Sequence, residues 1–558
     1  MDFSPRTLAR INRSAVGSRD SLHFDLLSFK GAPYVRRGTM LKKKLIFVLV
    51  ALALVFSVPL PSHSCQASEA NVYVQLQSLI DVMNYIKSNY VEETAQSELI
   101  DGAIDGVLRQ LDPHCYYLRP RELSNMAERL RGDFEGIGIM FDIRDGVLTV
   151  IAPIEGSPAD RVGLKASDKI VKIDGKTALG ITTQEVYQKL RGPRGTKVNV
   201  SVKREGEEEL LEFAIVRDKI PIYSIPSFFM LTSEIGYIWV ARFSQRTDYE
   251  LEKALRQLES QGMKKLVLDL RWNGGGPLLQ AVKVADKFIK SGRICYTQGR
   301  TSDSTQEYYA TEEGTYPYFP LIVLINHASA SASEIVAGAI QDCDRGLVVG
   351  QTSFGKGLVQ GQFKLRNGGA IFLTIAHWYT PSGRLIQRPY RNKSRADYVA
   401  EAFRDTSRSG NEAKPVFHTL KGRKVYGGGG ITPDIVLKGR NSGKLQRKLR
   451  DRNAFFDFAA YYLGTQPQMP ENFDQFQQNF QVDDSIILQF KDFLFSRKIG
   501  FSPEDFQHEL GSIKNSIKAE IAGELWGAEE KYQIYLEKDP EVLQTIELFD
   551  KAEQLLAE

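Results

Sequence analysis

The sequence contains few of the residues around which disulfide scaffolds and metal sites are built. Its 558 residues include only four cysteines and seven histidines, and no two cysteines form a C-x-x-C pair. No histidine occurs in an H-E-x-x-H motif or at zinc-ligand spacing, and the G-x-S-x-G nucleophile elbow is missing. We therefore expect neither a zinc hydrolase nor an α/β-hydrolase, and the chemistry predicted below needs no metal and no organic cofactor.

An excess of charge of one sign is also missing. The net charge of +4 on 62.8 kDa is too small to indicate a nucleic-acid partner. The polar, basic segment Tyr390–Tyr426 is accordingly predicted to be a solvated surface loop or a mobile lid. A chain of 558 residues is long enough for three or four domains.

What the sequence does contain is a serine-rich turn followed by a glycine-flanked lysine. The apolar run Leu321–Ile325 predicts a buried strand, and a Ser/Ala cluster then leads into a helix at Glu334–Gln341. A second predicted strand, Gly346–Gly350, is followed by Lys356 between two glycines. A serine at a strand-to-helix turn can present its hydroxyl beside free N–H groups, and burial can lower the pKa of a lysine until it serves as a base. Together they indicate a serine–lysine hydrolase.

Each of these residues also has a plainer explanation when it is taken alone. Ser331 stands three residues before Glu334, a spacing that is more typical of a helix capping box than of a nucleophile. Ser329 and Ser333 compete for either role. Lys356 by itself is more typical of a solvated loop lysine, because lysines are rarely buried.

The spacing of Lys356 and Gln360 favours the catalytic interpretation. On an extended segment the two side chains point to the same face, so the glutamine can accept a hydrogen bond from the lysine amine and orient it. His327 lies near the serine cluster but is more typical of a polar loop residue. A Ser-His-Asp triad that uses His377 stays open.

A second glycine cluster supports hydrolysis. Lys265–Leu270 reads as a buried strand, and it is followed by Arg271-Trp272-Asn273-Gly274-Gly275-Gly276 and then by a helical pattern at Leu278–Ile289. Consecutive glycines after a strand let backbone N–H groups converge on an anion, and the G-K-[ST] ending of a phosphate loop is missing. We predict an oxyanion hole made by Gly275, Gly276 and the N–H of Ala332.

With these motifs the chain resembles the carboxyl-terminal processing, or tail-specific, serine proteases of peptidase family S41. The resemblance rests on three segments, Asp269–Gly276, Asn326–Glu334 and Phe354–Gln360. It implies that Ser331 is the nucleophile, that Lys356 is the base and that Gln360 assists. It also implies a mixed α/β fold with a Clp protease/crotonase-like core, an inserted PDZ domain and helical N- and C-terminal regions. Trp272 and Pro277 depart from the family pattern and leave open which glycine forms the oxyanion hole.

Between residues 131 and 219, strand patterns at Phe134–Ile139 and Val147–Ile151 are followed by the run SPADRVGLKASDKIVKIDG and by a predicted helix at Thr183–Leu190. With these motifs the segment resembles the PDZ domain that accompanies these proteases. A PDZ domain accepts a peptide as an added strand at a sheet edge, and N–H groups of a turn receive the terminal carboxylate. We predict that Gly136, Ile137 and Gly138 form this turn and that Ile137 and Ile139 border an apolar pocket. An isolated G-I-G is otherwise more typical of a turn that simply joins two strands.

The remaining boundaries follow from helical spacing and from the resemblance. Apolar residues recur at helical spacing in Val72–Tyr90, Glu98–Leu111 and Leu445–Leu463, so residues 70–130 and 440–558 are predicted to be N- and C-terminal helical regions. The resemblance implies that residues 220–439 are the protease core. We expect the C-terminal region to serve packing, homo-oligomer contacts or docking of an adaptor rather than chemistry. The whole chain is predicted to be a serine endopeptidase that cuts proteins near their C-terminal tails. A catalytically silent PDZ scaffold that holds such tails is the alternative.

The N-terminal residues predict export. Met40–Lys44 is basic, Leu45–Val58 is apolar and Pro59–Ser64 contains small residues, so residues 40–64 are typical of a signal peptide. The apolar run is short for a membrane span, although an uncleaved anchor stays an alternative. Residues 1–39 are predicted to be a misassigned upstream segment. The expected location is the bacterial cell envelope, in the periplasm.

Overall fold

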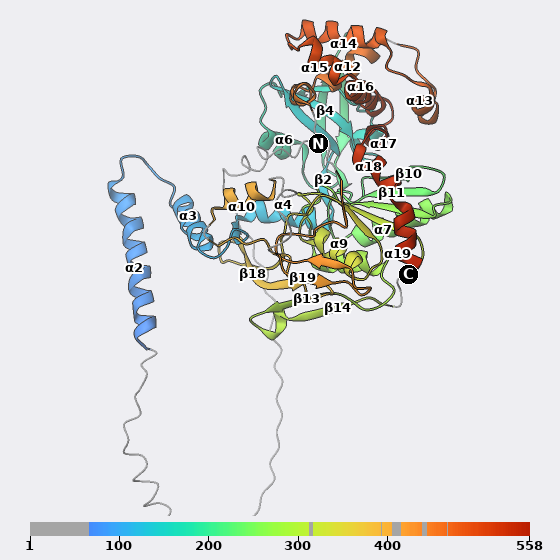
Figure 1. Ribbon diagram of the computed structural model, residues 1–558. Helices are drawn as coiled ribbons and strands as arrows, with labels where there is room; N and C mark the ends of the chain where they lie inside the picture. The colour runs from blue at the N-terminus through green and yellow to red at the C-terminus, as the bar shows by residue number, and fades with distance from the viewer. Residues whose placement is uncertain are drawn as a thin grey trace, which may run out of the picture. The chain divides into compact units, whose positions relative to one another are not determined.

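The computed structural model describes residues 66–311, 316–391, 393–403, 414–437, 443–465 and 467–557 (Figure 1). The chain divides into two compact units, one ending at Gln110 and the other beginning at Leu111. The predictions for residues 1–64 lie outside the described residues. Within the described residues, no helix combines the length and apolar character needed to cross a membrane.

The first unit contains two helices, α2 (Gln66–Asn89) and α3 (Gln96–Arg109). Both were predicted from apolar spacing, and both lie within two residues of the expected C-terminal ends. Helix α2 keeps large apolar side chains in contact with solvent, among them Val72, Tyr73 and Leu76.

The catalytic half of the second unit is built on a six-stranded sheet in the order β10-β11-β12-β15-β16-β21. Its strands are β10 (Ser227–Met230), β11 (Ile235–Trp239), β12 (Lys265–Asp269), β15 (Leu321–Ile325), β16 (Leu347–Gly350) and β21 (Ile435–Val436). All neighbours pair in parallel except β10 with β11. Helices α7 (Thr247–Ser260), α8 (Leu278–Asp286) and α9 (Ala332–Asp342) pack one face into the main apolar core.

The parallel order of this sheet explains where the predicted site forms. Strands β12, β15 and β16 are neighbours, and their C-terminal ends lead into the glycine loop, the serine turn and the lysine loop, respectively. Ligands of open parallel sheets bind beyond the carboxyl ends of the strands, because the connecting loops converge there. Three segments that are up to 90 residues apart in the sequence are therefore brought to one edge of the sheet.

A second sheet lies beside the lysine loop. It has the order β1-β18-β13-β14, and β17 pairs with β18. Its strands are β1 (Tyr116–Leu118), β13 (Arg293–Gly299), β14 (Gln306–Tyr309), β17 (Leu358–Lys364) and β18 (Ala370–Tyr379). Strand β1 therefore brings residues from the start of the second unit to the sheet that contains Gln360.

The PDZ-like module is inserted between helix α4 (Pro120–Arg131) and the core. Its sheet has the order β3-β4-β5-β7-β8, with β6 beside β5, and helix α6 (Thr183–Leu190) begins and ends where it was predicted. The strands are β3 (Ile139–Arg144), β4 (Val147–Pro153), β5 (Lys169–Ile173), β6 (Lys176–Thr177), β7 (Lys197–Lys203) and β8 (Leu211–Val216). The chain enters through β2 (Asp133–Gly136) and leaves through β9 (Asp218–Pro221), and these two strands pair with each other.

The C-terminal region is helical, as predicted, from α11 (Lys444–Asp451) to α19 (Phe549–Ala557). The helices between them are α12 (Ala454–Gly464), α13 (Phe473–Asn479), α14 (Asp484–Ser496), α15 (Pro503–His508), α16 (Leu510–Leu525), α17 (Ala528–Leu536) and α18 (Pro540–Ile546). The single helical run expected at Leu445–Leu463 is broken at Asn453, which has a left-handed backbone with φ of 52°. Leu536, Val542 and Phe549 pack in one apolar cluster with Val267 and Leu324 of the catalytic sheet.

The prediction for Tyr390–Tyr426 was wrong for part of that segment. Residues 395–402 form helix α10, and Tyr398 on this helix is almost completely buried. Its hydroxyl accepts a hydrogen bond from Gln387 and lies 3.0 Å from Nε2 of His114. The basic composition concealed one aromatic anchor, so α10 is packed through Tyr398 and Ala402, while residues 395–397 stay exposed.

Candidate active site

The serine turn separates the three serines that compete for the role of nucleophile. The Ser329 hydroxyl donates to the Leu270 carbonyl at 2.8 Å, and the Ser333 hydroxyl donates to the Asn273 carbonyl at 2.9 Å. Both are fully buried, so these two hydroxyls fasten the serine turn to the glycine loop. Ser331 between them is only partly buried and has a backbone φ of 56°, which is uncommon for a residue with a Cβ atom. Such local strain is a frequent feature of functional turns.

Glu334 connects the serine turn with the lysine loop. Its carboxylate is fully buried and accepts hydrogen bonds from the N–H groups of Ser331 (2.8 Å), Gly355 (2.6 Å) and Lys356 (2.9 Å) and from the Ser353 hydroxyl (2.6 Å). Burial raises the pKa of this carboxyl, and the hydrogen bonds oppose the rise. The sequence indicated only a capping residue at this position. The contacts with the lysine loop could not be seen in the S-x-x-E spacing.

Lys356 and Gln360 are brought together as their spacing predicted. The Lys356 amine donates to Oε1 of Gln360 at 2.6 Å. The amide of Gln360 is itself oriented, because its Nε2 donates to the His114 carbonyl at 2.6 Å. This second bond requires the amide oxygen to face the lysine, so the orientation follows from the hydrogen-bond network. The lysine is thereby held by an acceptor that carries no charge.

The surroundings of Lys356 favour its neutral form. Burial lowers the pKa of this lysine below its usual range, while Glu334 and Asp112 act in the opposite direction. The same crowding affects His114, whose pKa is lowered to about 4, first by burial and then by the charge of Lys356. The indole N–H of Trp378 donates to the Lys356 carbonyl at 3.0 Å and holds the backbone of the loop.

The glycine loop lies directly against the serine turn. A Cβ atom on Gly275 would be 2.8 Å from Cβ of Ser331 and 2.9 Å from the Ala332 nitrogen, so only glycine allows this approach. The Gly275 N–H donates to Oδ1 of Asn273 at 2.9 Å, which occupies this donor in the structure. Ala332 is the first residue of helix α9, where N–H groups have no partner within the helix. The N–H groups of Gly276 and Ala332 have no acceptor among the described residues.

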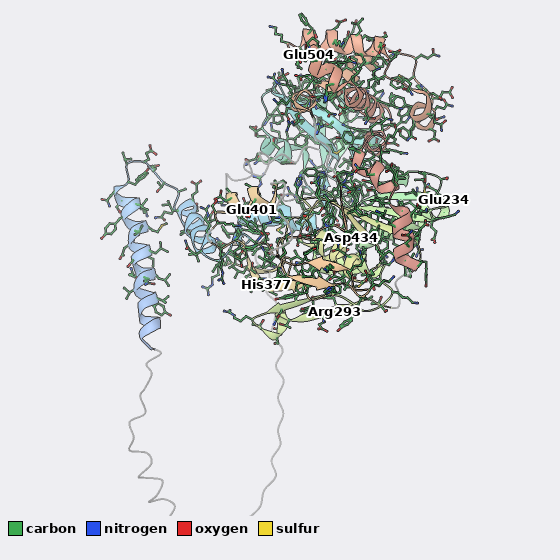
Figure 2. All side chains as sticks on the ribbon, in the orientation of Figure 1. Glu234, Arg293, His377, Glu401, Asp434 and Glu504 are labelled. Atoms are coloured by element: carbon green, nitrogen blue, oxygen red, sulfur yellow. The ribbon has the colours of Figure 1, made fainter. Side chains whose placement is uncertain are left out.

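Neither histidine alternative has a hydrogen bond to a serine among the described residues. Nδ1 of His327 lies 3.0 Å from Oε1 of Gln351, and its ring contacts Trp272 and Phe403 edge-on. His377, which Figure 2 labels, lies on β18 opposite Gln298 of β13 and Leu358 of β17, and its buried Nδ1 has no hydrogen-bond partner in the described part of the chain. Lys356 has no hydrogen bond to Ser331 among these residues either, and its contact with its predicted partner Gln360 is what distinguishes it.

The predicted carboxylate-binding turn precedes an edge strand. Strand β3 pairs only with β4 among the described strands, which leaves its other edge open. The Ile137 carbonyl accepts from the Ala159 N–H, and the Gly138 carbonyl accepts from the Ile154 N–H and the Ser157 hydroxyl. No acceptor for the N–H groups of Ile137 and Gly138 is found in the described part of the chain. The Ile137 side chain is buried in the apolar core of the module, while Ile139 is partly buried.

Comparison with known proteins identifies the family. The model of peptidase family S41 matches residues 234–394, and a PDZ model matches residues 149–204. A carboxy-terminal-processing protease of Bartonella bacilliformis is 37% identical over 350 residues, which are 62% of this chain and 80% of that protein. The chain belongs to this family of proteases. The carboxy-terminal processing protease CtpA of Bacillus subtilis is 34% identical over 61% of this chain and 74% of that protein.

Family membership confirms the predicted enzyme class and fold. The chain is a serine peptidase of family S41, with a mixed α/β fold, a PDZ domain and helical terminal regions. A solved structure of a photosystem II D1 C-terminal processing protease is 26% identical to this chain, with a TM-score of 0.34. The match covers 66% of this chain and 86% of the solved chain. A model named for the N-terminal domain of the activating protease CtpB matches residues 59–120. Residues 445–527 match a family of unknown function.

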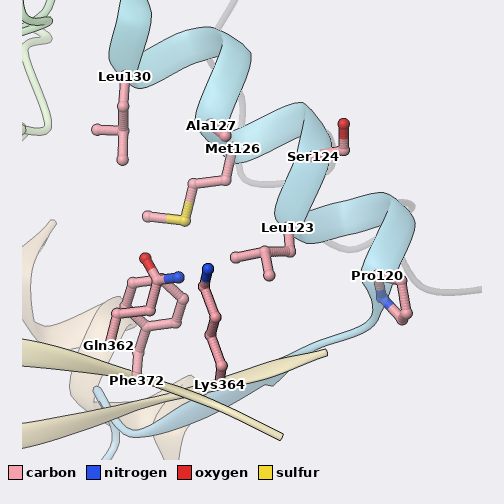
Figure 3. A pocket seen from close by; sticks show the side chains of 9 residues that line it. All are labelled: Pro120, Leu123, Ser124, Met126, Ala127, Leu130, Gln362, Lys364 and Phe372. Atoms are coloured by element: carbon pink, nitrogen blue, oxygen red, sulfur yellow. The ribbon is translucent and has the colours of Figure 1, made fainter. Parts of the chain in front are cut away.

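Figure 3 shows an open pocket of about 370 Å³ that lies away from the predicted catalytic residues. Leu123, Met126 and Leu130 line it from helix α4, and Gln362, Lys364 and Phe372 line it from strands β17 and β18. None of the predicted site residues borders it. Within the described residues there is also no group of three or more His, Cys, Asp or Glu side chains placed to hold a metal ion.

Proposed function

We propose that this S41 protease is an endopeptidase in which Ser331 and Lys356 form a catalytic dyad, assisted by Gln360. The supporting observation is the buried Lys356 amine, which donates to Gln360 at 2.6 Å while burial lowers its pKa. Neutral Lys356 removes the proton from the Ser331 hydroxyl, and the serine oxygen attacks a peptide carbonyl. The protonated lysine then gives this proton to the leaving amine.

The oxyanion of the tetrahedral intermediate is stabilised by backbone donors. Ala332 at the start of α9 and Gly276 in the glycine loop supply N–H groups with no other acceptor among the described residues. Gly275 contributes through its close approach to Ser331, and its own N–H serves once it leaves Asn273. Donors held in place before the reaction are usually the largest contribution to acyl-transfer catalysis. Water then attacks the acyl-enzyme, with Lys356 as the base again.

The PDZ module selects protein substrates by their C-terminal tails. A tail adds as a strand to the open edge of β3, and its carboxylate is received by the N–H groups of the turn at Gly136–Gly138. Ring centroids of Phe141 on β3 and Tyr187 on α6 lie 5.5 Å apart, so aromatic side chains stand between strand and helix beside this edge. The enzyme acts in the bacterial cell envelope. This part of the proposal rests on the predicted signal peptide at residues 40–64.

The test is cleavage of an unfolded protein, with the product ends identified by mass spectrometry. The wild type is expected to cut near the C-terminus, and Ser331→Ala is expected to bind the same protein without cutting it. Ser382→Ala, outside the catalytic loops, is the matched control and keeps activity. Cleavage by Ser331→Ala would refute the assignment.

N-terminal sequencing of the chain from the cell envelope is expected to find a start near Cys65, and a start at Met1 would refute the signal peptide.

A further inference from the structure

The residue that leads into the glycine loop is held by the C-terminal region of the chain. Arg271 follows strand β12 and is 5% exposed. Its Nε and Nη2 donate to the Asp269 carboxylate, with the shortest distance 2.7 Å. Its Nη1 donates to Glu541 at 2.7 Å and to Asp539 at 3.1 Å, both at the N-terminal end of helix α18. The guanidinium thus joins the catalytic sheet to a helix that is 270 residues away in the sequence.

Glu541 also contacts the segment that leads into the lysine loop. Its Oε1 accepts from Nε2 of Gln351 at 3.3 Å, while its Oε2 accepts from Arg271. Gln351 follows strand β16, five residues before Lys356, and its amide oxygen lies 3.0 Å from Nδ1 of His327 at the start of the serine turn. One carboxylate therefore contacts the residues at the bases of two catalytic loops, and through Gln351 it is connected to the third.

The position of Glu541 is itself fixed. Asp539 caps helix α18 by accepting from the N–H groups of Glu541 and Val542, so the side chain that binds Arg271 also orders the backbone that carries Glu541. Val542, Phe549 and Leu555 hold the same segment on the catalytic sheet. This segment lies beyond both the S41 match at 234–394 and the match at 445–527.

We propose that Glu541 is a positioning residue for the proposed Ser331–Lys356 reaction. By binding Arg271 and Gln351 together, it sets the spacing between the glycine loop, which carries oxyanion donors, and the loop that carries the base. The carboxylates of Asp269, Asp539 and Glu541 all surround the Arg271 guanidinium, so neutralising its charge does not require Glu541. What Glu541 alone provides is a bridge between two loops. Small displacements of such groups lower the rate of reaction while leaving tail binding intact.

Two substitutions of similar size separate positioning from packing. Glu541→Met keeps the length of the side chain but accepts no hydrogen bond from Arg271 or Gln351. Glu541→Gln keeps the bridge, because its amide oxygen accepts from Arg271 and its NH2 group donates to Oε1 of Gln351 once the Gln351 amide turns over. With β-casein as substrate, Glu541→Met is expected to lower kcat by about tenfold to a hundredfold with KM within about twofold of the wild type. Glu541→Gln is expected to keep kcat within about threefold.

The matched control lies on the same segment. Glu553 on α19 forms an ion pair with Lys265 at 2.5 Å, at the opposite end of strand β12 from Arg271. Glu553→Met is therefore expected to leave kcat unchanged. The midpoint of thermal unfolding is measured for all variants. If Glu541→Met does not fold, Gln351→Met breaks the same bridge from the catalytic side and is expected to lower kcat with KM unchanged.

A peptide aldehyde provides a readout that packing alone would not change. The aldehyde forms a hemiacetal with a nucleophilic serine, and the hemiacetal oxygen contacts the oxyanion donors. Its inhibition constant is therefore expected to rise in Glu541→Met by the same factor by which kcat/KM falls. A folded Glu541→Met protein with the kcat of the wild type would overturn the proposal. So would equal losses in the Gln and Met variants. If the aldehyde fails to inhibit the wild type, the Ser331 nucleophile is refuted, and the kcat ratio of the two Glu541 variants still decides the positioning role.

Discussion

Two glycine-containing loops of this protease gather backbone N–H groups, and they are supported in different ways. The loop at 273–276 is held by residues from the serine turn, from Phe243 and, through Arg271, from helix α18. In the turn at 136–138, Gly136 pairs with Asp218 of β9, and the Ile137 and Gly138 carbonyls accept from groups of one short segment, 154–159. In the proposed function the first loop meets a charge that exists only during the reaction, and the second receives a charge that the substrate always carries. We therefore expect changes in the first loop and its partners to alter kcat, and changes in the second to alter KM.

The largest effect is expected from Lys356, the proposed base. Lys356→Arg should lower kcat by about 10⁴-fold or more, because arginine does not lose its proton in proteins. Lys364→Arg, further along β17 and exposed, is the control and should be active. In the wild type, kcat/KM should rise with pH as Lys356 loses its proton, below the pH at which an ordinary lysine titrates, because burial lowers its pKa. A flat profile or an active Lys356→Arg enzyme would contradict the dyad.

A methyl group in the first loop should damage the reaction and spare tail binding. The added Cβ of Gly275→Ala would lie 2.8 Å from Cβ of Ser331 and 2.7 Å from the Ala330 carbonyl oxygen, so the loop must move away from the serine turn. We expect kcat to fall by about 10²- to 10³-fold, the usual cost of a lost oxyanion donor. Steady-state kinetics on a substrate with a free terminus checks this. Gly274→Ala is the control, because its Cβ would have no neighbour within 4 Å.

A methyl group in the second turn should have the opposite signature. The Cβ of Gly138→Ala would lie 2.3 Å from Cβ of Ser157, at a φ of 82°, so the turn cannot keep its shape. We expect KM to rise by about tenfold with kcat nearly unchanged. Amidation of the substrate terminus should raise KM in the wild type and have no further effect in Gly138→Ala. A fall in kcat without a change in KM in Gly138→Ala would contradict the proposed difference between the two loops.

The smallest effect concerns the contact that seats the PDZ module on the C-terminal helices. The Ser167 hydroxyl donates to Glu524 at 2.6 Å, and burial raises the pKa of Glu524 from 4.5 to about 7. The folded protein then binds a proton that the unfolded chain releases between about pH 4.5 and pH 7, so this group's contribution to stability falls as the pH rises through that window. Glu524→Gln should remove this slope, with a gain on the order of 1 kcal/mol above pH 7. Chemical unfolding at several pH values measures it, with exposed Glu504→Gln as the control.

Local patterns predicted the parts of the site that are local in sequence. The spacing predicted that Lys356 and Gln360 meet, although Lys356 precedes β17 and the register shifts between Val359 and Gln360. The strand at Leu321–Ile325 has the predicted bounds. The catalytic loops were predicted one by one because each follows a short apolar strand. Their supports were missed, because the His114 carbonyl that orients Gln360 and the Glu541 carboxylate that holds Arg271 are 246 and 270 residues away from their partners. An isolated histidine carbonyl or glutamate has no sequence signature, since its role arises only when the sheets assemble.

The ribbon formed by β2 and β9 has a mechanical consequence for the PDZ module. The two chain segments that lead into and out of the module are hydrogen-bonded to each other over four residue pairs, from Asp133 opposite Pro221 to Gly136 opposite Asp218. A domain on a single strand of linker can swing in any direction, whereas one on a paired ribbon bends mainly about one axis. The module also contacts the C-terminal helices through Ser167 and Glu524, and this contact restricts the bending further. For the tail binding proposed above, the ribbon therefore limits how far a bound tail can move relative to the catalytic sheet.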